Sequence, residues 1–116
     1  MSQYLIAVNH QPGAQAEGAA YQDEAALQAA FERVGAFNES LQQAGRFVYA
    51  CGLEAPETAT IVSDGAPERP GPLNDAGWQL GGFWVVEADD DDAALELATQ
   101  AAAACGQTIE LRRMQG

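Results

Sequence analysis

The sequence contains no lysine, and five arginines are its only strongly basic side chains, against 17 acidic residues. The formal charge of -12 repels phosphate groups, whose neutralisation is the main source of affinity for nucleic acids. No run of about eighteen apolar residues is present, and the first residues lack the basic start and apolar stretch of a secretory signal. We therefore expect a cytoplasmic protein that binds neither nucleic acids nor membranes.

Cysteine is almost as scarce. Cys51 and Cys105 are too few and too far apart for a disulfide framework or a clustered metal motif, and we expect two small buried thiols. The acidic run 89–92 lacks the spacing of a calcium loop and is better explained as the first turn of a helix. No glycine fingerprint with a lysine is present for a nucleotide. The sequence thus predicts no metal and no organic cofactor.

With 116 residues, 47% of them hydrophobic, the chain is expected to form a single domain. Apolar residues spaced three or four apart predict a first helix over 23–44, and an alanine-rich segment predicts a second over 93–104. Runs of β-forming residues predict five strands, at 4–8, 47–51, 58–62, 79–88 and 108–114. The stretch 64–77, broken by proline and glycine, is predicted to be a long loop and a candidate wall of a binding site.

The order β-α-β-β-β-α-β predicts an α+β fold with both helices on one face of a sheet. The run Phe83–Val86 is too continuously apolar for a strand with one face in water. Because two helices cannot cover both faces, we expect the second face to be covered by a second copy of the chain, related by a two-fold axis. The sequence therefore predicts a homodimer.

The most specific motif is the block Gln79-Leu80-Gly81-Gly82-Phe83-Trp84, followed at a fixed distance by the second helix. With the first strand and the preceding Gly-Pro turn, it resembles the YCII-related family, in its DGPF branch, over nearly the whole chain. The resemblance implies ferredoxin-like subunits that form a dimeric α+β barrel. The Asp-Gly-Pro-Phe turn of that branch is replaced here by Pro70-Gly71-Pro72-Leu73. The His/Asp pair of the family's enzymes has its histidine in the first helix, where this chain has Arg33 or Val34.

His10 is the only imidazole, so acid/base chemistry near neutral pH requires His10 or a carboxyl with a strongly shifted pKa. Asp64 and Asp75 flank the long loop, and burial beside a tryptophan would raise the pKa of either carboxyl. Asp75 is the preferred candidate, because Asp64 precedes a glycine in a common turn dipeptide. We expect His10 and Asp75 to be the catalytic pair; the alternatives are a solvated or hydrogen-bonded loop histidine and an ordinary turn aspartate.

Aromatic side chains follow the long loop in a composition suited to a flat or apolar ligand. Packing in the core or at an interface is the alternative for such residues. The residues expected to bind a substrate are Tyr49, Trp78, Gln79, Phe83 and Trp84.

Two functions of different classes follow from the sequence. The first is a small-molecule-binding dimer that performs cofactor-free acid/base chemistry, of a lyase, isomerase or cyclase type, with His10 or Asp75 as the base. The alternative is a non-catalytic binding or regulatory dimer, which the family resemblance links to an extracytoplasmic-function sigma factor.

Overall fold

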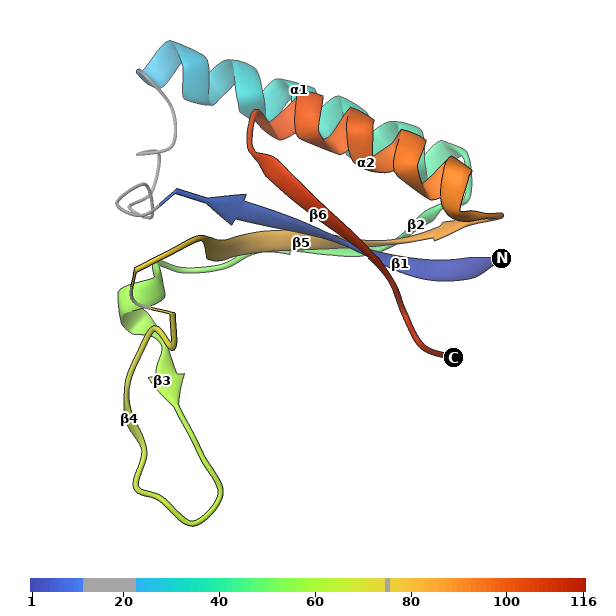
Figure 1. The fold of residues 1–116 in the computed structure, drawn as a ribbon. Helices are drawn as coiled ribbons and strands as arrows, with labels where there is room; N and C mark the ends of the chain where they lie inside the picture. The colour runs from blue at the N-terminus through green and yellow to red at the C-terminus, as the bar shows by residue number, and fades with distance from the viewer. Residues whose placement is uncertain (12–22, 75) are drawn as a thin grey trace.

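The computed structural model describes residues 1–11, 23–74 and 76–116. Its centre is a four-stranded sheet with two helices on one side (Figure 1). The strands lie in the order β2-β5-β1-β6, and every neighbouring pair is antiparallel. Their bounds are Ser2–His10 for β1, Phe47–Gly52 for β2, Gln79–Ala88 for β5 and Thr108–Arg113 for β6. The helices are α1, Glu24–Gln43, and α2, Asp91–Cys105.

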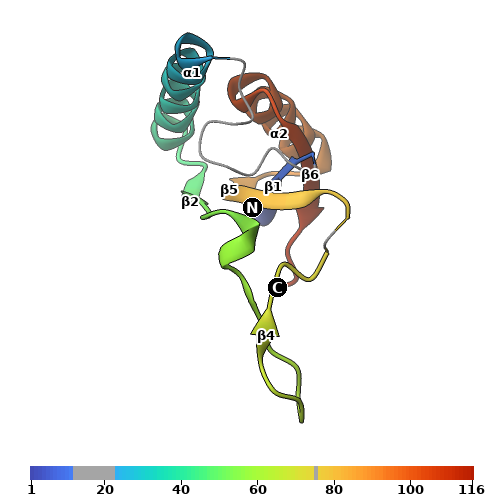
Figure 2. The ribbon, with the colours of Figure 1, turned by 90° about the vertical axis from the view of Figure 1, so that its left-hand side faces the viewer.

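The connections define a ferredoxin-like topology. The segments β1-α1-β2 and β5-α2-β6 each place a helix between two strands, and β5 lies between β1 and β2 in the sheet. Both helices cover the same face (Figure 2). The predicted α+β, ferredoxin-like class is therefore confirmed.

One predicted strand does not belong to this sheet. The segment predicted as a strand over 58–62 begins on the last residue of a short 3-10 helix, η1 (Pro56–Thr58), and contains only a two-residue strand, β3 (Thr60–Ile61). β3 pairs with β4 (Arg69–Pro70), which lies inside the stretch predicted to be an irregular loop. The chain leaves the sheet after Leu53, whose N–H donates to Gly81 O at 2.9 Å, so the following residues form a separate hairpin.

Side-chain caps explain where the helices begin. Asp23 accepts a hydrogen bond from the N–H of Ala26, and Asp90 accepts one from the N–H of Ala93, both at 2.8 Å. α2 ends at Gly106, whose φ of 70° is the left-handed conformation that glycine adopts without strain. The predicted acidic first turn of the second helix is confirmed, and the helix begins at Asp91 rather than at residue 93.

The core lies between the sheet and the helices. Alternate residues of β1 and β5 point into it, and the second helix contributes mainly alanines, which allow close approach to the sheet. The core side chains include Tyr4, Ile6, Val8, Phe37, Leu41, Trp84, Val86, Ala94, Ala98 and Ala101. Cys105 is also buried, and burial raises the pKa of its thiol, whereas Cys51 is only half-buried.

Trp84 is the largest side chain of this core and only 5% exposed. Its ring meets Phe37 edge to face, with centroids 5.4 Å apart and planes at 82°. Its indole N–H donates to Asn38 Oδ1 at 2.6 Å. Trp84 therefore joins β5 to α1 by both packing and a hydrogen bond.

Trp84→Ala should lower the free energy of unfolding by about 3 to 5 kcal/mol, because it leaves a cavity in the core and removes the hydrogen-bond donor to Asn38. Trp78→Ala is the matched control: Trp78 is 46% exposed, and its loss should change stability by less than about 1 kcal/mol. Urea unfolding followed by circular dichroism measures both. Equal losses for the two variants would contradict the placement of Trp84.

Candidate functional site

The face of the sheet opposite the helices carries a patch of apolar side chains that no described element covers. These residues alternate with the core residues, as the cross-strand pairs Leu5↔Val85 and Ala7↔Phe83 show beside Ile6↔Trp84. The edge strand β2 adds Tyr49, opposite Val85, and Cys51, opposite Phe83. We call Leu5, Tyr49, Cys51, Phe83 and Val85 the uncovered face; the small Ala7, on the same side, is buried between its neighbours.

Two of the predicted substrate-binding residues lie together on this face. The rings of Tyr49 and Phe83 have centroids 6.2 Å apart and planes inclined at 46°. Tyr49 is exposed and Phe83 is half-buried. Trp84 points to the other side of the sheet, into the core, so the structure does not bring it together with the other two rings.

A second group of residues meets where β1 ends and β5 begins. The pairing of these strands slips between Val8 and Asn9, which leaves Gly81 as an extra residue in β5, and His10 then pairs with Gln79. His10 continues the alternation of Val8, on the helix side of the sheet. A Cβ at Gly81 would lie 1.9 Å from His10 Nε2, so only glycine leaves room for the imidazole in this position.

A hydrogen bond orients the imidazole of His10. Its Nδ1 lies 3.3 Å from Oε1 of Gln107, in the loop between α2 and β6. An amide oxygen can only accept, so in the neutral imidazole this contact places the proton on Nδ1 and leaves the lone pair on Nε2. Nε2 is therefore the atom of His10 that can act as a base.

The loop before β5 is held against this corner by Gln79, which is buried. Its side-chain nitrogen donates to the carbonyl oxygens of Asn74 and, at 3.4 Å, Gly77. Asn74 in turn donates to the carbonyl oxygen of the exposed Trp78 at 3.0 Å. Gln79, expected to bind a substrate, is thus engaged in holding the loop, and it is the direct cross-strand neighbour of His10.

Of the two predicted acids, the structure describes only Asp64. Asp75 lies outside the described residues. Asp64 is exposed, in the segment that joins β3 to β4. The structure therefore places His10 beside Gln79, and it does not bring Asp64 to the same corner.

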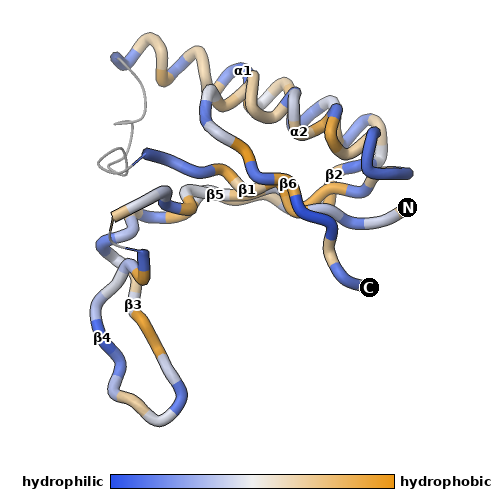
Figure 3. Tube along the Cα trace, in the orientation of Figure 1, coloured by the Kyte–Doolittle hydropathy of each residue, from blue (hydrophilic) through white to orange (hydrophobic). Residues whose placement is uncertain are grey.

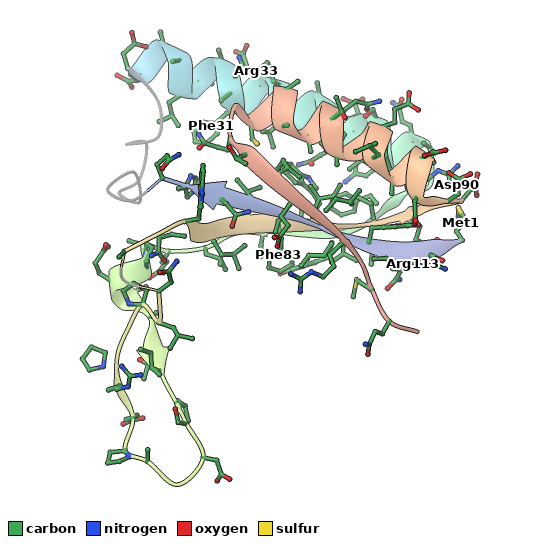
Figure 4. All side chains as sticks on the ribbon, in the orientation of Figure 1. Met1, Phe31, Arg33, Phe83, Asp90 and Arg113 are labelled. Carbon is green, nitrogen blue, oxygen red and sulfur yellow. The ribbon has the colours of Figure 1, made fainter. Side chains whose placement is uncertain are left out.

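A polar hollow of about 340 Å³ lies at the opposite end of the sheet, where Asp90 and Arg113 are found (Figure 4). It is lined by Tyr4, Asp89, Asp90, Asp91, Asp92 and Arg113. The phenol of Tyr4 donates to Asp91 Oδ1 at 2.6 Å; this hydrogen bond, with burial, raises the pKa of Tyr4. No local sequence pattern indicates this hollow, because its residues come from three distant segments: β1 pairs Tyr4 with Arg113 of β6, and the acidic residues follow β5.

The described residues do not suggest a metal centre. Among residues 1–11, 23–74 and 76–116, no three histidine, cysteine, aspartate or glutamate side chains are grouped so that they could hold a metal ion. Neither α1 nor α2 has the length and apolar character that a membrane crossing requires within the described chain.

The order of the elements and of the strands defines a ferredoxin-like α+β fold. The chain belongs to the YCII-related domain family, whose model matches residues 2–114. The resemblance drawn from the Gln79–Trp84 block is therefore confirmed at the level of the family. No curated protein matches the chain.

Gly81→Ala should displace the His10 ring, because the added methyl group would overlap Nε2. His10 is the only histidine, so its ring protons can be assigned without ambiguity in a proton NMR spectrum. We expect a clear change in their chemical shifts. Gly52→Ala is the matched control, since a Cβ there meets nothing within 4 Å. An unchanged His10 signal in the Gly81→Ala variant would contradict the packing of the ring on Gly81.

Proposed function

We propose that this protein is a homodimer that binds a small organic molecule and performs cofactor-free acid/base chemistry on it, with His10 Nε2 as the base. The observation that carries the chemistry is the orientation of the single imidazole by Gln107 over Gly81. A base whose tautomer is set by a second group needs no reorientation before it takes a proton. The reaction class is proton abstraction next to a carbonyl, as in an isomerase, cyclase or lyase.

Asp75 is proposed as the acidic partner of His10. Asn74, which precedes it in the sequence, is bonded to Gln79, the cross-strand neighbour of His10. The proposal needs a group that returns a proton to the substrate, and a carboxyl whose pKa is raised by desolvation supplies such a group.

The uncovered face supports the dimer. Leu5, Phe83 and Val85 lie half-buried in its centre. The chain exposes 7493 Å² of surface, whereas a compact monomer of this mass exposes about 6,100 Å². The excess of about 1,400 Å² exceeds the roughly 800 Å² that each partner buries in a standard protein interface. The aromatic pair Tyr49 and Phe83 lies on this face, on the other side of the sheet from His10, and is proposed to pack within the interface.

A non-catalytic binding or regulatory dimer, linked to an extracytoplasmic-function sigma factor, is the second candidate. One observation favours it: Arg33, near the position expected for the family's catalytic histidine, donates from Nε to the carbonyl oxygen of Ala104 at 3.1 Å. This arginine serves to hold α1 against α2, a structural role. The two candidates differ in whether His10 turns over a ligand or only contacts it.

Phenylpyruvate is a suitable probe, because removal of a proton from its methylene group is the chemistry that His10 is proposed to perform. Its neutral methyl ester is the second probe, because the charge of -12 disfavours anions. Binding of a probe should raise the melting temperature of the protein. The protein should also accelerate the exchange of the probe's methylene protons for deuterium in heavy water. His10→Gln should reduce this acceleration by about 100-fold or more while leaving the melting shift in place.

Other results of this experiment have definite meanings. A melting shift without accelerated exchange, in the protein with His10 intact, favours the non-catalytic candidate. Equal exchange rates for the protein and its His10→Gln variant would contradict the role of His10. If neither probe raises the melting temperature and neither shows accelerated exchange, binding of aryl keto compounds is contradicted.

Val85→Asp should convert the dimer into a monomer, because it places a charge at the centre of the proposed interface, opposite Leu5 and Tyr49. Leu95→Asp is the matched control: Leu95 is 58% exposed on α2, away from the sheet. Sedimentation equilibrium measures the mass of each variant, and circular dichroism checks that each is folded. A Val85→Asp variant that dimerises as tightly as the control would contradict this interface.

A further inference from the structure

The hairpin that contains β3 and β4 stands away from the rest of the chain. We call residues 59–71 the arm. At its base the N–H of Gly71 donates to Ala59 O at 2.8 Å, and above it Thr60 pairs with Pro70 and Ile61 with Arg69. Figures 1 and 2 both show the arm projecting from the sheet on the side opposite the helices. The arm and the uncovered face therefore lie on the same side of the sheet.

The arm makes little contact with its own chain. Its strands pack on each other and make no extended contact with the four-stranded sheet or with either helix. The radius of gyration of 15.4 Å exceeds the value of about 13.4 Å expected for a compact chain of this length. A two-stranded hairpin by itself is at best marginally stable in water, so this arm needs a surface to hold it.

The arm also exposes an apolar side chain that no described residue of its own chain covers. Val62 follows β3 directly and is 77% exposed. Figure 3 shows this apolar segment on β3 beside a hydrophilic β4. An exposed valine next to a short strand is typical of a segment whose contacts are made with another surface.

Arg69, at the base of the arm, is a single positive charge that points to an acidic surface. Within residues 1–11, 23–74 and 76–116, the side chain of Arg69 has no hydrogen-bond or ion-pair partner. The other four arginines bond to their own chain: Arg33 to Ala104, Arg46 to Asp89, Arg112 to Glu110 and Arg113 to Ser2. The arm also carries Asp64 and Glu68, so its net charge is -1 and only Arg69 in it is complementary to the 15 acidic residues outside the arm (17 in the chain less these two).

We propose that the arm of each copy docks on the body of a second copy of this chain, with Val62 at the contact and Arg69 facing the acidic surface. This inference rests on the dimer of the proposed function, because the uncovered face brings the second copy to the side where the arm projects. The arm leads through residues 71–74 to the bonds that tie Asn74 to Trp78 and Gln79. A docked arm therefore fixes the loop beside His10, and the ligand site is complete only in the dimer.

The experiment compares dimer dissociation constants for the full-length protein and two variants by sedimentation equilibrium. Val62→Asp should weaken the dimer by at least about tenfold, because it places a carboxylate against an acidic partner. Leu95→Asp adds the same charge at an exposed leucine on α2 and should leave the dissociation constant unchanged. Circular dichroism and thermal melts of both variants confirm that each remains folded.

Hydrogen exchange gives a second readout that does not depend on the Val62→Asp variant. The amide hydrogens of residues 60–69 should exchange at least about tenfold more slowly in the native dimer than in the monomeric Val85→Asp variant, since a docked ladder is protected and an isolated hairpin is not. Mass spectrometry of the peptides that cover the arm measures these rates.

The outcomes distinguish a failure of arm docking from a failure of the proposed dimer. If the native protein is a dimer and Val62→Asp dimerises as tightly as Leu95→Asp, or the arm exchanges equally fast in dimer and monomer, docking of the arm is overturned and the dimer stands. If the native protein is a monomer at millimolar concentration, the dimer and the docking of the arm both fail. A weaker Val62→Asp dimer together with a protected arm supports the inference.

Discussion

β5 lies between β1 and β2 and distributes its side chains between two very different environments. Trp84 and Val86 point to a core closed by two helices, while Phe83 and Val85 point to a face that no described element covers. This alternation is a consequence of the pleat and cannot be altered without shifting the register of the whole sheet. The core, the shape of the chain and the proposed interface all follow from it.

Much of the fold could be predicted from the sequence because its signals are local. The spacing of apolar residues gave the first helix within a residue at each end, since Asp23 caps it through its own side chain. The runs at 47–51 and 79–88 became β2 and β5 for the same reason, because β-forming residues there are continuous and bounded by turns. The one-sided placement of the helices followed from the order of these elements.

What the sequence could not give depends on contacts between distant residues. The strand predicted over 58–62 was wrong as a member of the sheet, because its composition does not reveal that its partner is Arg69–Pro70. The continuous run Phe83–Val86 does not tell which of its aromatic rings faces the core; only the register with β1 places Trp84 there and Phe83 opposite. The packing of His10 on Gly81 likewise depends on a one-residue slip in pairing that no local pattern predicts.

The candidate site therefore has two parts with different physical origins. His10, Gly81 and Gln107 form a corner within one chain, where a bulge makes room for an imidazole whose lone pair is on Nε2. The aromatic pair Tyr49 and Phe83 belongs to the uncovered face and gains a closed environment only if another surface meets it. The two parts lie on opposite faces of the sheet, so a ligand that meets Nε2 of His10 lies at the corner, whereas the aromatic pair belongs to the proposed dimer interface.

The most direct test of the central claim is an isotope-filtered NMR experiment on a sample that mixes labelled and unlabelled chains. It detects only nuclear Overhauser effects between different copies of the protein. Such effects are expected between the side chains of Leu5, Phe83 and Val85 in one copy and those of the same face in the other. Their absence at millimolar concentration, with the 12.2 kDa mass of a single chain in solution, would contradict it.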